Sequence, residues 1–82
     1  MAKFKSKIGI GVFKYGTQWM VTLDNLPEDQ DDFHTVERKV KRNIPKEQRE
    51  GIEFDSEYSQ FVAYAPNKDS AVALATKMEK IL

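Results

Sequence analysis

The chain of 82 residues contains no cysteine, one histidine and one tryptophan, with only four glycines and three prolines. The absence of cysteine excludes disulfides, thiolate nucleophiles and cysteine-ligated zinc or iron–sulfur sites. It is also typical of a reducing compartment, so we expect a cytoplasmic location. Uninterrupted apolar runs are too short to cross a bilayer, and the first residues lack the apolar stretch of a signal peptide. We therefore expect no membrane partner.

Neither sign of charge is in excess, because 13 basic residues balance 13 acidic ones. A protein dedicated to nucleic-acid binding is usually basic overall. The charges are nonetheless segregated, with acids over residues 24–32, bases over 38–49 and acids again over 50–57. Such a bipolar surface favours oriented docking on another protein.

The first part of the chain has the alternation of a β-hairpin. A strand is predicted over Phe4–Phe13, with Ile8, Ile10 and Val12 on one face. A turn follows over residues 14–17, and a second strand over residues 18–23. The side chains of the second strand that we expect on the buried face are Trp19, Val21 and Leu23.

A helix is predicted after the acidic segment 27–32 and runs to about Asn43. Its apolar stripe consists of Phe33, Val36, Val40 and Ile44. We expect this stripe to meet the buried face of the first hairpin. Glu37 and Lys41 have the spacing of an i,i+4 ion pair, and Pro45 ends the helix.

The second half repeats this order more weakly. Ile52 and Phe54 alternate with acids, residues 55–57 read as a turn, and residues 58–65 as the return strand. A last helix is predicted over residues 70–81, with Asn67 or Asp69 as its N-cap. Its apolar face comprises Ala71, Leu74, Ala75, Met78, Ile81 and Leu82.

These elements predict a single small domain over residues 1–82. The expected fold is α+β, with the order ββαββα: a four-stranded antiparallel sheet with both helices packed on one face. A chain of this size buries only about 60–65% of its unfolded surface, so we expect a small margin of stability.

Candidates for catalysis are few. His34 is the only histidine, and His34 with Glu37 has metal-capable spacing but no second such motif. The acidic segment 24–32 does not fit a calcium-binding loop, and helix N-terminal acids explain it better. Glu53 and Asp55 share a strand face, for which a solvated edge strand is the simpler explanation. We expect no enzymatic activity, no metal and no cofactor.

A binding surface is better supported, on the face of the first hairpin opposite its buried side. Lysines, glycines and exposed aromatics alternate there, and a second basic group lies on the first helix. The candidate binding residues are Lys3, Lys5, Lys7, Phe13, Lys14, Tyr15, Met20, Arg38 and Arg42.

Two functions fit this surface. The first is a small protein-interaction module, an adaptor or inhibitor, that docks through an open sheet face or a strand edge. The second is single-stranded DNA or RNA binding, in which lysines meet phosphates and Phe13 or Tyr15 stacks on a base. Another protein is the expected partner, and a second copy of the chain, forming a homodimer, is an alternative.

Overall fold

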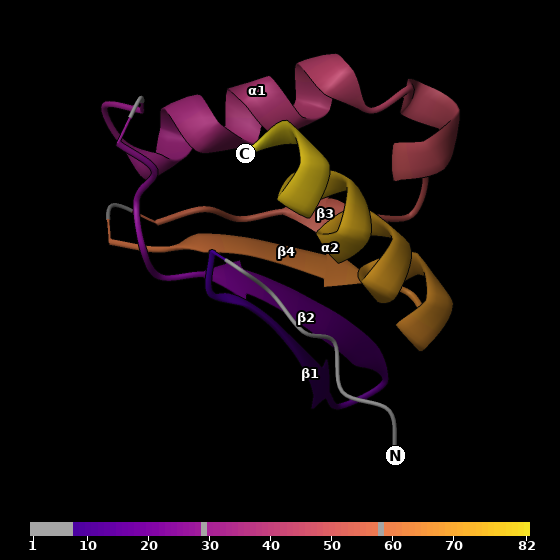
Figure 1. The fold of residues 1–82 in the computed structure, drawn as a ribbon. Helices are drawn as coiled ribbons and strands as arrows, with labels where there is room; N and C mark the ends of the chain where they lie inside the picture. Colours follow the sequence, from indigo (N-terminus) through magenta and orange to yellow (C-terminus); the bar gives the residue numbers. More distant parts are fainter. Residues whose placement is uncertain (1–7, 29, 58) are drawn as a thin grey trace.

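The structure has two layers, a four-stranded antiparallel sheet and two helices that lie on one of its faces (Figure 1). The computed structural model describes residues 8–28, 30–57 and 59–82. The elements follow one another as β1 (Ile10–Tyr15), β2 (Gln18–Leu23), α1 (Phe33–Asn43), the 3₁₀ helix η1 (Lys46–Arg49), β3 (Glu53–Phe54), β4 (Phe61–Ala65) and α2 (Lys68–Ile81). This order confirms the ββαββα prediction.

The strands lie in the order β1-β2-β4-β3, and every neighbouring pair is antiparallel. The first hairpin is closed by a two-residue loop at Gly16 and Thr17. Gly16 has a φ of 62°, which glycine adopts without steric strain. The two halves of the chain meet at the centre of the sheet, where Val21 of β2 lies opposite Ala63 of β4.

Asp32 is the N-cap of α1. Its carboxylate accepts hydrogen bonds from the backbone N–H of Thr35 at 2.7 Å and from the Thr35 hydroxyl at 2.9 Å. The backbone bond satisfies a donor that has no partner within the helix. It is also the main cause that holds the pKa of Asp32 below its ordinary value.

The apolar stripe of α1 is buried, as its helical spacing predicts. The buried side chains of this segment are Phe33, Val36, Val40 and Ile44. The helix ends at Asn43 because Ile44 precedes Pro45 and takes an extended conformation.

Polar residues on the flank of α1 connect it to the second hairpin. Glu37 and Lys41 form the predicted ion pair, with Nζ and Oε2 3.4 Å apart. The other carboxylate oxygen of Glu37 accepts a hydrogen bond from the Ser56 N–H at 3.3 Å. The Lys41 Nζ lies 5.1 Å from the centre of the Phe54 ring. Glu37 and Lys41 therefore contact each other and also the segment from Phe54 to Ser56.

Asn67 is the N-cap of α2, since its side-chain oxygen accepts a hydrogen bond from the Ser70 N–H at 2.8 Å. The helix consequently starts at Lys68, two residues before the predicted position. Its buried side chains are Ala71, Leu74, Ala75 and Met78. In the described parts of the chain, neither helix is long and apolar enough to span a membrane.

One apolar core lies between the sheet and the helices. Trp19, Val21 and Leu23 contribute to the same core as the stripe of α1. The helix that packs on the first hairpin is nevertheless α2, which contacts β1 and β2 and also reaches β4, whereas α1 packs mainly on β4. The first hairpin is therefore covered by the helix of the other half of the chain, which is a tertiary arrangement that periodicity does not predict.

The first strand differs from its predicted range. Residues 4–7 lie outside the described residues, and β1 begins at Ile10. Gly9 has a φ of 89°, which interrupts the extended backbone before the strand. At the other end, Lys14 and Tyr15 belong to the strand and not to the turn, because Tyr15 pairs with Gln18.

The predicted turn at residues 55–57 is wrong. The Asp55 N–H donates to the Val62 carbonyl at 2.9 Å, and Glu57 pairs with Gln60. The chain therefore reverses between Glu57 and Gln60. The turn preference of residues 55–57 is overridden because the hairpin pairing continues through them. The return strand is also shorter than predicted, since β4 covers only Phe61–Ala65.

We expect Phe61→Ala to lower the free energy of unfolding by about 3–5 kcal/mol, because the ring is fully buried and its removal leaves a cavity. The matched control is Phe13→Ala, whose ring is 52% exposed and whose loss should cost less than about 1 kcal/mol. Urea unfolding of both variants measures the difference. Equal losses would contradict the assignment of the two faces.

We expect the Asp32 cap to make stability sensitive to acid. Because the folded-state pKa is lowered, its contribution is present above the ordinary aspartate pKa of 3.8 and is lost as the pH falls through the lowered value. Asp32→Asn keeps an acceptor oxygen but does not titrate. Thermal melts between pH 2 and pH 7 should fall less steeply below pH 3.8 for this variant than for the wild type. Parallel curves would show that the cap is not formed.

Candidate functional site

The candidate site is the face of the sheet opposite the two helices, which we call the open face (Figure 1). Side chains of a strand alternate between the two faces, so the residues next to the core positions belong to it. Its described members are Gly11, Phe13 and Tyr15 of β1, Gln18, Met20 and Thr22 of β2, Val62 and Tyr64 of β4, and Glu53 of β3.

One row of the open face crosses all four strands. Phe13 lies opposite Met20, Met20 opposite Tyr64, and Tyr64 opposite Glu53. Side chains directly opposite one another on neighbouring strands are close enough to interact. The row therefore changes from an aromatic end at β1 to an acidic end at β3.

The ring of Phe13 lies over Gly11. A Cβ added at Gly11 would overlap that ring and would stand 3.0 Å from the Thr22 hydroxyl oxygen. Thr22 and Val62 are only 4% and 5% exposed, although both helices lie on the other face. The centre of the open face is therefore partly shielded from water. The Phe13 ring can lie there because Gly11 has no side chain.

Tyr15 and Tyr64 form an aromatic pair across β2. Their ring centres are 5.6 Å apart and the rings are tilted by 44°. Partial removal from water is the main cause that raises the pKa of Tyr64 above its ordinary value of 10.0. The neighbouring Tyr15 hydroxyl and then the carboxylates of Asp55, Glu57 and Glu53 raise it further. The electrostatic potential around this pair is therefore negative.

The described side chains of the open face include no lysine or arginine. Glu53, Asp55 and Glu57 are exposed along the arm of the hairpin that contains β3. Lys14 is exposed at the end of β1, but the alternation of the strand turns it toward the side of the helices. The described part of this face therefore attracts positive charge.

The structure separates the predicted binding residues. Arg38 and Arg42 are exposed on α1, which lies on the opposite face of the sheet. Phe13, Tyr15 and Met20 do share the open face. The remaining predicted residues, Lys3, Lys5 and Lys7, lie outside the described residues.

Sequence reasoning missed Tyr64. Its signal was available in the alternation of β4, where Phe61, Ala63 and Ala65 are buried and Tyr64 must face the other way. Its nearness to Tyr15 had no such signal, because it depends on the pairing of β2 with β4.

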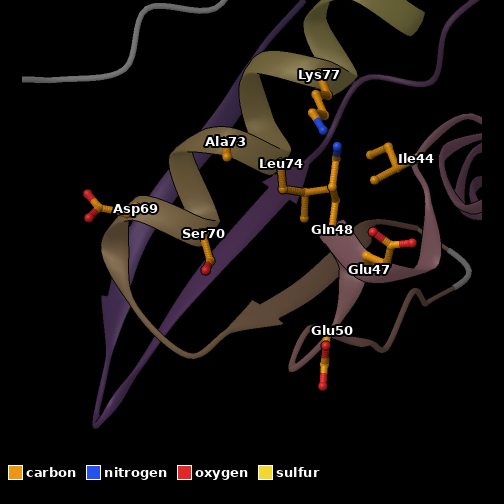
Figure 2. A pocket seen from close by; sticks show the side chains of 9 residues that line it. All are labelled: Ile44, Glu47, Gln48, Glu50, Asp69, Ser70, Ala73, Leu74 and Lys77. Atoms are coloured by element: carbon orange, nitrogen blue, oxygen red, sulfur yellow. The ribbon is translucent and has the colours of Figure 1, made fainter.

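A separate cavity of about 470 Å³ lies between η1 and α2. Figure 2 shows Gln48 and Lys77 extending toward each other beside it, while Asp69 points away from it. Across residues 8–28, 30–57 and 59–82, no three histidine or acidic side chains are grouped as metal ligands. His34 is exposed on α1.

Similarity to known proteins does not assign a function to the open face. No model of a protein family matches the chain, and neither a curated protein nor a solved structure is significantly similar to it. The geometry and the charges of the open face therefore carry the functional inference.

We expect Gly11→Ala to displace the Phe13 ring without unfolding the sheet, because the added methyl group and the ring occupy the same space. A double-mutant cycle with Phe13→Ala should give a coupling of about 1 kcal/mol, since truncation of the ring removes the overlap. Urea unfolding measures the cycle, and nuclear Overhauser effects between the Phe13 ring and Thr22 report the displacement. Additive effects with an unmoved ring would refute this packing.

Proposed function

We propose that this protein is a small non-enzymatic protein-interaction module that docks on another protein through its open face. The exposed aromatic surface carries the proposal, because Phe13 is 52% and Tyr15 is 58% exposed. Met20 and Tyr64 extend the same surface as half-buried side chains. Exposed apolar side chains contribute little to the stability of the fold. Their burial against a partner would remove them from water and would stabilise the complex.

The composition of the open face supports a protein partner. The central parts of protein interfaces are enriched in tyrosine, phenylalanine and methionine and are surrounded by polar residues. Here the apolar centre has Gln18 on one side and the acids of the second hairpin on another. An adaptor or an inhibitor of a larger protein would use such a surface, in a cytoplasmic compartment that the absence of cysteine favours.

Docking through the face is better supported than docking through an edge. β3 is two residues long and offers few backbone groups to a partner strand. The other edge strand, β1, has a charged side chain at Lys14, and such a charge disfavours pairing between edges.

Single-stranded nucleic acid is the alternative that an experiment must separate. A nucleic-acid platform needs cations beside its stacking rings, in order to neutralise phosphates. The described residues place Glu53 and Asp55 beside the rings, and place Arg38 and Arg42 on the other face. The acids favour a protein partner.

The proposal is tested by affinity capture with the immobilised full chain, using extracts of the source cell with and without nuclease. We expect the wild type to retain a protein that Phe13→Ala/Tyr15→Ala does not retain, because the aromatic contact area is lost. Arg38→Ala/Arg42→Ala is the matched control, since it changes two exposed side chains on α1. Capture that survives the loss of both rings, or that nuclease abolishes, would argue against this function.

A further inference from the structure

Aromatic rings on the two sides of the sheet differ in their access to cations. On the helix side, Lys41 Nζ lies 5.1 Å from the centre of the Phe54 ring, and Lys68 Nζ lies 5.7 Å from the centre of the Trp19 ring. Both rings therefore have a cation from the chain itself. Among the described residues, no lysine or arginine lies over Tyr15 or Tyr64.

The surroundings of the Tyr15–Tyr64 pair would attract a cation. An aromatic face carries negative potential and binds lysine or arginine, and the attraction increases when water is partly excluded. Tyr64 lies opposite Glu53 of the neighbouring strand, and the Glu53 side chain is exposed. Asp55 and Glu57 are close enough to act electrostatically on Tyr64. A cation over the rings would thus interact with both aromatic faces and carboxylates.

We propose that the partner protein places an arginine side chain on the Tyr15–Tyr64 pair, against Glu53, and an apolar side chain on Phe13 and Met20. This inference rests on the proposed function and specifies the chemistry of the partner. Arginine fits better than lysine because a planar guanidinium stacks on a ring and binds a carboxylate through two hydrogen bonds.

The strand spacing specifies how far apart the two partner side chains are. Neighbouring strands lie about 4.8 Å apart, so the distance from the middle of the Phe13–Met20 pair to Tyr64 is about 7 Å. Side chains at positions i and i+2 of an extended segment are also about 7 Å apart and point the same way. The expected recognition sequence is therefore an apolar residue and an arginine separated by one residue, in either order.

The test is a selection of random displayed peptides on the immobilised full chain. We expect the enriched peptides to contain an apolar residue and an arginine separated by one residue, in either order. A synthetic peptide of this kind should bind about tenfold more weakly when citrulline replaces arginine, because the charge is lost and the shape is kept. Its affinity should also fall as salt is added.

Matched variants assign the binding to this site. Glu53→Gln and Tyr64→Ala should each lower the affinity for the peptide by about fivefold to tenfold. Tyr64→Phe keeps the ring and should bind the peptide nearly as tightly as the wild type does. Glu47→Gln is the charge control, because it removes an exposed carboxylate on η1. Thermal melts check that each variant is folded.

The outcomes separate the inference from the proposed function. Peptides without a basic residue that depend on Phe13 and Tyr15 would overturn the arginine site and leave the function standing. Absence of enrichment, or binding that no open-face variant changes, would overturn both. Light scattering would show a dimer as twice the monomer mass of 9.5 kDa. A dimer that Tyr64→Ala converts to a monomer would assign the face to a second copy of the chain and would overturn the arginine partner.

Discussion

The antiparallel pairing of β2 with β4 is the constraint on which the rest of the structure depends. It joins the two halves of the chain and places Val21 opposite Ala63 on the side of the helices. The same register places Met20 opposite Tyr64 on the other side. Because side chains alternate with a period of two, a slip of one residue would exchange the core and the open face. Burial of the core therefore also specifies the composition of the open face.

The two helices cover one side of the sheet, and neither of them covers the other side. α1 and α2 both lie on the same face (Figure 1), where α1 packs mainly on β4 and α2 packs on β1, β2 and β4. Their N-caps, Asp32 and Asn67, end the preceding segments by satisfying the first free backbone donors. Within the described residues, the opposite face is shielded only by its own side chains. Phe13 does so in part, because Gly11 leaves room for its ring.

The separation of charge in the sequence becomes a separation of surfaces. The basic residues of α1 lie on the helix side, where Lys41 is engaged by Glu37 and the Phe54 ring. The acids of the second hairpin lie beside the aromatic pair of the open face. The described part of the open face thus has an excess of acidic side chains, although the chain as a whole has zero net charge. In protein complexes, such a separation of charge orients the partner and increases the rate of association more than the affinity.

The sequence by itself determined the α+β class, both helices and the two faces of β2, because local periodicity states which side chains are buried. It also predicted that Phe13, Tyr15 and Met20 share an exposed face. Local residue types misplaced the turn at 55–57, where hairpin register overrides turn preference. Only the tertiary structure decided the strand order, the choice of α2 to cover β2, and the meeting of Tyr15 with Tyr64 and Glu53. These contacts join residues distant along the chain, and spacing within one segment carries no information about which other segment will lie beside it.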